Sequence, residues 1–341
     1  MSTLVHCIAV SPKSWFFEAD SGASTGTSPD HGDRVGHRRA CAAGRRIEWP
    51  TIALAVVIYG LWILATCFWR ELPWPALAAA GAWIITWQMN LQHEVIHGHP
   101  TPSRLANDGI GIWPLSLWLP FSIYRATHLR HHQDANLTDP FEDPESYYWT
   151  SAGWRDLGVC GRALAWARST LLGRVVFGPA WMIAGTLAAT FRDAWTGKPG
   201  GRAALFWHCA LCVPVLIWIV GVCGIPVWVY IACFVYPGAS LAMVRSFAEH
   251  RSAPEPEKRT AIVENARILG PLFLYNNLHV AHHLRGGLPW YQIPKLYRLN
   301  RAALIDRNGG LVYRSYFDVA RRYLLTPHDR TVHPDWDGRA A

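Results

Sequence analysis

Long apolar stretches, separated by short polar segments, dominate the hydrophobic pattern of this chain. No Asp, Glu, Lys or Arg occurs in residues 51–69, 72–92 and 203–244. The third stretch is about twice the length of one membrane span, and Gly224-Ile225-Pro226 divides it near its middle. Because a helix of about 20 residues crosses the hydrocarbon core, the pattern predicts four transmembrane helices, at about 50–69, 73–92, 203–223 and 225–244.

Two further apolar segments are less regular. Residues 109–124 are interrupted by two prolines, so we expect an interfacial or re-entrant piece there. Residues 175–191 are uncharged, but Arg174 and Arg192 flank them and Gly and Pro interrupt them. We expect an interfacial helix in this second segment, with a true membrane span as the alternative.

Composition supports a membrane protein. Hydrophobic residues make up 51% of the 341 residues and charged residues only 16%, against about 25% charged in soluble proteins. The eight cysteines are scattered and show no disulfide framework. The predicted fold is therefore an all-α integral membrane protein, in which residues 49–325 form the membrane domain with a helical cap. Residues 1–48 are expected to be a disordered basic tail, and residues 326–341 a C-terminal tail.

The distribution of charge predicts the orientation. Four spans place both termini on the same side, together with an Arg cluster just before the first span. The opposite loops hold only Arg70 and Glu71. Since basic loops stay in the cytoplasm, both termini and the cap are expected on the cytoplasmic side of the cell (inner) membrane. The net charge of +8 suits contact with anionic lipid or an acidic partner protein.

Histidines provide the candidate chemistry. The chain has 16, and ten of them lie in three short clusters or at one further position: His93, His97 and His99; His128, His131 and His132; His279, His282 and His283; and His250. Neutral imidazole is the commonest side-chain metal ligand. Because about four ligands fill a zinc site, these clusters exceed the needs of one ion and predict two metal ions, each held by four or five nitrogens.

Helical spacing assigns some of these histidines. His93 and His97 are four residues apart and face the same side of a helix, so we expect them to share a metal ion. In the other two clusters the first two histidines are three apart, and the third, adjacent histidine can turn toward a second ion. His99 is offset from His97 and is expected to support a ligand or the fold. His208 lies inside an apolar helix and is expected to be a packed core residue.

The histidines alone leave several metals and functions open. A nitrogen-rich site accepts iron, copper, zinc or nickel. The sequence HEVIH also matches the HExxH zinc-protease motif, with Glu94 as the base, but a protease would leave two clusters unexplained. A membrane carrier of haem or metal would place histidines within the spans, where only His208 lies.

The whole pattern resembles the histidine boxes of the membrane fatty-acid desaturase and hydroxylase superfamily. The resemblance covers residues 50–325 and rests on the spacing of the three clusters in their order with the spans. The segments Arg245–His250 and Asn276–His279 also resemble the family's extra ligand after its last span and its run into the third box. It implies that iron is bound by nine residues: His93, His97, His128, His131, His132, His250, His279, His282 and His283.

The resemblance implies an enzyme, an O2-dependent oxidoreductase with two non-haem iron ions. The expected reaction is introduction of a C=C bond into the fatty acyl chain of an acyl lipid or acyl thioester. The alternatives are desaturation of a small hydrophobic metabolite, such as the amino-acid-derived dihydrorhizobitoxine, and hydroxylation or ketone formation. Electrons would come from a separate ferredoxin-like or cytochrome-type donor. Membrane lipids are further expected partners, and nucleic acid is not.

One position departs from the family pattern, and several others are candidates to support the metal ligands. Some relatives place an Asn one turn before the extra histidine, where this chain has Ser246. Carboxylate and amide side chains beside metal ligands often orient the imidazoles. The candidates for such support are Glu94, His99, Glu249 and Asn276. The acidic side chains of the loop after the second cluster, Asp134, Asp139 and Glu142, are expected to face solvent, with a role in shaping that cluster as the alternative.

Overall fold

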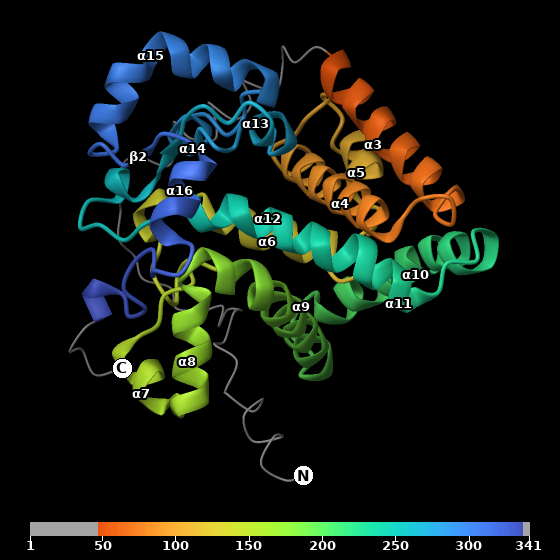
Figure 1. Cartoon of the computed structure of the whole chain (residues 1–341), viewed down its shortest axis with the longest axis horizontal. Coiled ribbons are helices and arrows are strands. Elements are labelled where there is room, and N and C mark those ends of the chain that lie inside the picture. The colour runs from red at the N-terminus through yellow and green to blue at the C-terminus, as the bar shows by residue number, and fades with distance from the viewer. Residues whose placement is uncertain (1–46, 337–341) are drawn as a thin grey trace.

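A computed structural model describes residues 47–336 of the chain, and these residues are mostly helical (Figure 1). Nearly all of the predicted 1–48 tail, and residues 337–341, lie outside the described residues. The elements in chain order are α3 (Trp49–Cys67), α4 (Trp74–Ile96), α5 (Arg104–Gly111), α6 (Phe121–His131), η1 (Asp134–Asn136), α7 (Ser151–Asp156), α8 (Val159–Arg168), α9 (Leu171–Trp195), α10 (Gly201–Leu216), η2 (Ile217–Val222), α11 (Val227–Tyr230), η3 (Ile231–Val235), α12 (Tyr236–Glu249), η4 (Pro256–Arg259), β1 (Ile262–Val263), α13 (Leu269–Leu272), α14 (His279–Leu284), η5 (Trp290–Gln292), α15 (Ile293–Arg307), β2 (Val312–Tyr313), α16 (Tyr316–Tyr323) and η6 (Pro334–Trp336).

Four helices are long and apolar enough to cross a membrane, which agrees with the predicted all-α membrane fold. By length and composition they are α3, α9, the continuous helix Gly201–Val222 and the continuous helix Val227–Glu249. This set includes α9, for which an interfacial helix was expected, and omits α4, for which a span was expected. The omission follows from polar residues in the second half of α4, among them Gln88, Asn90 and Gln92.

Contacts at the helix ends show how these helices run. The indole N–H of Trp69, after α3, donates a 3.0 Å hydrogen bond to the carbonyl of Cys223, between η2 and α11. The turn joining α3 to α4 therefore lies beside the turn joining α10 to α11, at the right-hand edge of Figure 1. At the other end, the backbone N–H of Glu48 donates to the carbonyl of Pro100. Helix α4 therefore runs the full length between the two ends, as α3 does.

Helix α9 begins and ends on the side of the cap. The backbone N–H of Leu172 donates to the carbonyl of Leu324, which follows α16 in the cap. The last residue of α9, Trp195, is joined to the start of α10 by only five residues, 196–200. Because α10 and η2 lead away to the turn at Cys223, the start of α10 also lies on the cap side. A helix with both ends on one side cannot span, so connectivity favours an interfacial α9 and the predicted span in α4.

The segment between α5 and α6, residues 112–120, is irregular yet buried, as the prolines of the predicted re-entrant piece suggest. In a lipid environment its backbone carbonyls need protein donors. Polar side chains of three helices supply them. Gln88 Nε2 donates to Trp113 over 2.8 Å, the Tyr230 hydroxyl to Leu115 over 2.8 Å, and His208 Nε2 to Leu117 over 3.0 Å.

The hydrogen bond from His208 to Leu117 agrees with the expectation of a packed residue and leads to a prediction. His208→Ala is expected to keep its full metal content, because His208 supports Leu117 and belongs to neither histidine group described below. It removes a donor from a buried carbonyl, so stability should fall by about 1–3 kcal/mol. Metal analysis and a thermal melt of the purified protein test both parts. Loss of metal with the fold retained would contradict this account of His208.

Helix α4 packs closely against the continuous helix formed by η3 and α12 because glycine occupies both contact points. A Cβ atom added at Gly81 would lie 2.3 Å from the carbonyl oxygen of Cys233, and one at Gly238 would lie 2.5 Å from Cβ of Ile85. The Gly238 carbonyl also accepts a 2.9 Å hydrogen bond from the Thr86 hydroxyl. The two helices that lead into the first histidine cluster and into His250 are thereby held in a fixed register.

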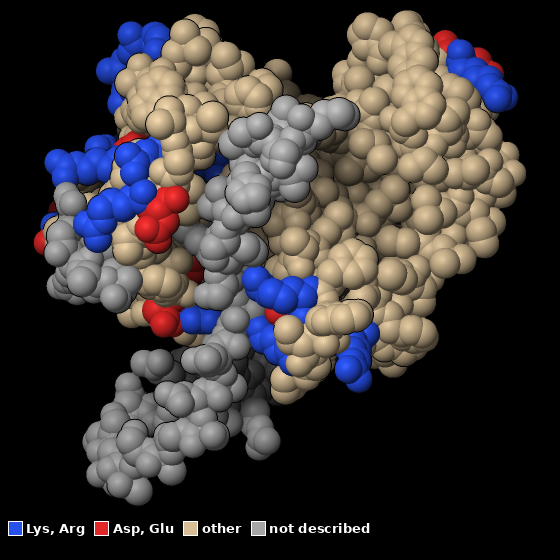
Figure 2. Space-filling model, turned by 90° about the horizontal axis from the view of Figure 1, so that it is seen from below, with Lys and Arg blue, Asp and Glu red and all other residues tan. Residues whose placement is uncertain are grey.

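The polar cap covers one end of the helices. It includes the short parallel pair β1–β2, in which Ile262 lies opposite Val312, and helices α13 to α16. Figure 2 shows acidic and basic side chains mainly over the left half and lower middle of one face. The right half is bare of them except for a small group at its upper edge. This apolar half is the part that a membrane would surround.

Candidate metal centre

Nine of the ten predicted histidines converge at the junction of the spans and the cap. His93 lies in the last turn of α4, and His97 follows that helix directly. The second cluster ends α6, the third cluster opens α14, and His250 ends α12. Each cluster therefore lies at a helix end, where a short turn fixes the direction of its side chains.

The nine side chains form two groups. Within each group, one ring nitrogen of every histidine lies within 4.8 Å of those of the others. We call them the five-histidine group and the four-histidine group. The first contains His93, His97, His128, His132 and His282, and the second contains His131, His250, His279 and His283. The second and third clusters contribute to both groups, so the groups are neighbours. His131 and His132, for example, have ring centroids 5.9 Å apart.

The structure corrects the expected division of the second and third clusters. The first two histidines of each cluster, three residues apart, were expected to share an ion. Instead His128 shares a group with His132, and His279 shares one with His283. At about 100° per residue, positions four apart differ by about 40° around the helix and positions three apart by about 60°. The pair four apart therefore points more nearly in one direction, as His93 and His97 do.

The nitrogen spacing fits a metal ion with ligands at right angles. In the five-histidine group, Nε2 of His128 lies 3.0 Å from Nε2 of both His97 and His132. In the four-histidine group, Nε2 of His250 lies 3.0 Å from that of His131 and 2.9 Å from that of His279. With metal–nitrogen bonds of about 2.1 Å, ligands at 90° are about 3.0 Å apart and tetrahedral ligands about 3.4 Å. The spacing thus matches octahedral-type geometry better than a tetrahedral zinc site.

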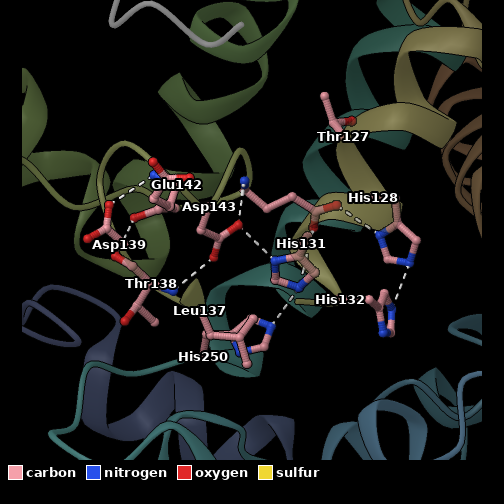
Figure 3. A network of polar contacts seen from close by, with 12 residues as sticks. Thr127, His128, His131, His132, Leu137, Thr138, Asp139, Glu142, Asp143 and His250 are labelled. Carbon is pink, nitrogen blue, oxygen red and sulfur yellow. Dashed lines mark hydrogen bonds and ion pairs between the residues drawn. The ribbon is translucent and has the colours of Figure 1, made fainter. Parts of the chain in front are cut away.

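Carboxylates fix the orientation of several imidazoles. Nδ1 of His128 donates to Glu145 over 2.9 Å, and Nδ1 of His131 donates to Asp143 over 2.9 Å (Figure 3). In the third cluster, Nδ1 of His279 lies 3.3 Å from a carboxylate oxygen of Glu249. A proton on Nδ1 leaves the lone pair of Nε2 directed into the group. This is the usual arrangement around metal-binding histidines.

Sequence reasoning missed two of these carboxylates. It considered Asp134, Asp139 and Glu142 in the acidic loop and expected them to face solvent. Asp139 caps the backbone N–H groups of Phe141 and Glu142, and Glu142 pairs with Arg130. The side chains that reach the histidines are instead Asp143 and Glu145. Their distance from the cluster in sequence gave no signal, because the path of the loop decides which carboxylates turn inward.

The four predicted supporting residues have different surroundings. Glu249 pairs with His279, as described. Glu94 is buried, accepts the backbone N–H of Trp290 over 3.1 Å, and has its other oxygen 3.9 Å from Nδ1 of His93. His99 lies in neither group: its Nδ1 is 2.6 Å from Glu48, at the start of α3. The Asn276 amide donates to the carbonyl of Phe273 and so stabilises the turn before the third cluster.

Burial keeps most of these imidazoles neutral and able to bind metal. Removal from water, reinforced by neighbouring histidines, lowers the pKa of His250, His279 and His282 well below its usual value. His131 is the exception. Burial opposes its charged form, but Asp143 and Glu145 outweigh burial and raise the pKa of His131 to about 9. A metal ion that binds His131 therefore displaces a proton.

Replacing Asp143 tests this support. Asp143→Asn is expected to weaken metal binding at the four-histidine group by about 10–100-fold, because the amide lacks the charge that orients and polarises His131. Titration against a competing chelator measures the change. Glu142→Gln in the same loop is the matched control, because Glu142 pairs with Arg130 and touches no clustered histidine in the described residues. Equal affinities in the two variants would show that Asp143 has no role in metal binding.

Comparison with known families now identifies the chain. The family model described as fatty acid desaturase matches residues 71–317. The chain belongs to the fatty acid desaturase family. The match includes all three clusters and His250. A search of curated proteins gave no match.

Membership in the desaturase family fits the site. It makes the chain an oxidoreductase of the desaturase and hydroxylase type, associated with the membrane through several helices. The donor set fits a metal-dependent member, since two groups of buried nitrogens lie side by side and neither ring nitrogen of His93 has a hydrogen-bond partner among the described residues. A zinc protease would need only His93, His97 and one further ligand, which leaves most of both groups without a role.

Proposed function

We propose that this protein is an O2-dependent membrane desaturase that introduces a C=C bond into a fatty acyl chain. The single observation behind the proposal is the pair of adjacent all-histidine groups at the membrane end of the cap. Nitrogen-rich donor sets suit transition ions, iron among them. We assign iron to both groups, with the nine histidines as ligands. Two bound iron ions would supply the oxidising power to remove hydrogen from an unactivated C–H bond.

The reaction balances with an external electron donor. A –CH2–CH2– unit, O2, two electrons and two protons give –CH=CH– and two molecules of water. We propose a separate ferredoxin-like or cytochrome-type protein as the source of the electrons, acting on the cytoplasmic side. The basic character of the chain, at +8, suits an acidic donor.

The protein's own residues position the substrate and the metal ligands. The apolar outer faces of the spans give a lipid chain access from the membrane. Asp143 and Glu145 hold protons at Nδ1 of their histidines and so direct Nε2 inward, and Glu249 lies 3.3 Å from Nδ1 of His279. The close contact of α4 with α12 fixes the relative positions of His93 and His250. The four predicted spans and the basic loops support a position in the cell membrane with the centre facing the cytoplasm.

A second candidate substrate is a small carboxylate, such as an amino-acid-derived metabolite. Arg245 lies one turn before His250, is mostly buried, and pairs with Glu249 at 3.4 Å. Its Nη1 is the atom that faces Glu249, and the buried hydroxyl of Tyr316 makes no hydrogen bond within the described residues. A buried guanidinium beside the centre suits a substrate carboxylate, which an acyl chain does not bring to its reacting carbons.

A product profile tests both candidates. A bacterial host would express wild type or His131→Ala together with a ferredoxin system, and lipids and small acids would be analysed by gas chromatography–mass spectrometry. A new unsaturated acyl species, present only with wild type, is the expected result. A hydroxy acid would assign a hydroxylase. An unchanged lipid profile from iron-loaded protein would contradict the acyl substrate and favour the small carboxylate.

A further inference from the structure

The segment after α16, residues 326–336, packs against the loops next to the metal centre. We call it the C-terminal strap. It lies beyond the family match, which ends at residue 317. Its backbone joins the loop after the second cluster: the N–H of Trp149 donates to Thr331 over 2.8 Å, and the N–H of His333 donates to Trp149 over 2.9 Å. The side chains of His328 and His333 are buried, with residue exposures of 3% and 2%.

One chain of contacts leads from the strap to His131. Nδ1 of His333 accepts the backbone N–H of Asp335, so its proton is on Nε2, which donates to the Thr138 hydroxyl over 3.0 Å. The backbone N–H of Thr138 donates to one oxygen of Asp143 over 2.8 Å. The other oxygen of Asp143 accepts from Nδ1 of His131 over 2.9 Å. Figure 3 shows Thr138, Asp143 and His131 in sequence along this path.

A second chain of contacts leads to the segment that carries His250. Asp329 accepts hydrogen bonds from the Tyr148 hydroxyl over 2.6 Å and from the Ser252 hydroxyl over 2.8 Å. The same Tyr148 oxygen accepts the backbone N–H of Ser252 over 2.8 Å. Ser252 is two residues after His250, so Asp329 fixes the course of the chain as it leaves this ligand.

Both paths end in the same group. His131 and His250 belong to the four-histidine group, and their Nε2 atoms lie 3.0 Å apart. They reach that group from separate parts of the chain, so their alignment depends on whatever joins those parts. The strap is one such link, because its residues bond both to the loop after the second cluster and to the segment after α12. It acts beside direct bonds between these two parts, such as that of the Tyr147 hydroxyl to the carbonyl of His250 over 2.8 Å.

We propose that the C-terminal strap positions His131 and His250 and thereby controls metal occupancy of the four-histidine group. His333 and Asp329 are positioning residues that act through Thr138, Asp143 and Ser252. The proposal rests on the proposed function only in requiring that each group binds a metal ion. It predicts that loss of the strap contacts removes the ion of the four-histidine group, whereas the five-histidine group keeps its ion.

The test is the iron content of the full-length chain, purified in detergent and loaded anaerobically with ferrous iron. Wild type should bind two ions per chain. His333→Ala should weaken the second ion by about 10–100-fold, as loss of support around metal ligands usually does, and bind one ion after desalting. His333→Gln, whose amide can donate to the Thr138 hydroxyl, should restore the second ion. Arg330→Ala is the matched control, because Arg330 is an exposed residue of the same strap.

The outcomes separate the two proposals. Fewer than two ions in wild type would contradict the proposed di-iron function before any variant is considered. Given two ions in wild type, His333→Ala that retains both with unchanged affinity, or loses both, would overturn the positioning role. If His333→Ala does not fold, as judged from its helix content, Thr138→Val decides the matter. It removes the hydroxyl but keeps the backbone N–H that Asp143 accepts, and it should bind one ion.

Discussion

Replacing His131 by Ala is expected to abolish turnover, with product formation at least ~1000-fold below wild type, since loss of a direct ligand should exceed the ~10–100-fold effect of losing a supporting residue. Bound iron should fall from two ions per chain to about one. The four-histidine group would keep only His250, His279 and His283, and the buried surroundings offer no replacement nitrogen among the described residues. Iron analysis and the product assay measure the two effects.

The corresponding variant of the other group provides a comparison. His282→Ala removes one of five histidines, so it should also abolish turnover but leave the four-histidine group loaded. His208→Ala is the matched control, because it removes an imidazole from the membrane region outside both groups. Full iron content and activity in His131→Ala or His282→Ala would show that these histidines are not ligands.

Replacing Gly238 by Val is expected to disrupt the packing of α4 against α12 and to lower stability by ~3 kcal/mol, at the upper end of the usual cost of overpacking. Even the first added carbon would lie 2.5 Å from Cβ of Ile85, which cannot move without moving the backbone of α4. Separation of these helices would also displace His250 from its group. A thermal melt followed by iron analysis measures both consequences.

A glycine in open space provides the control for this variant. A Cβ atom added at Gly60 in α3 has no neighbour within 4 Å, so Gly60→Val should leave the melting temperature and iron content unchanged. Equal melting temperatures for the two variants would mean that α4 and α12 do not depend on this contact.

Sequence alone could predict the histidine content of the centre because short-range periodicity determines it. Each cluster lies within about one and a half helical turns, so its side chains must emerge close together wherever the helix ends. The division of the second and third clusters was predicted wrongly. The first two histidines of each cluster, which are three residues apart, were paired, and the third was assigned to the other ion. The pair four apart shares a direction, and the remaining histidine, His131 or His282, serves the other group.

Features that depend on the path of the chain could not be predicted. Asp143 and Glu145 have no special spacing from His131, and the strap contacts join segments far apart in sequence. For α9, the pattern of hydrophobicity gave two alternatives. Only the position of its two ends on the cap side favours an interfacial helix. The predicted spans and the nine predicted iron ligands stay predictions that binding and topology experiments must test.

The order of the ligands along the chain also has a consequence for biosynthesis. The five-histidine group combines His93 at the end of α4 with His282 in α14, and the four-histidine group combines His131 with His283. Neither group is complete until the ribosome has made the third cluster, which follows all of the predicted spans. Four members of the five-histidine group precede residue 133, whereas the four-histidine group cannot be complete before translation has passed residue 283. If both groups bind metal as proposed, the order of synthesis predicts that the four-histidine group is loaded last.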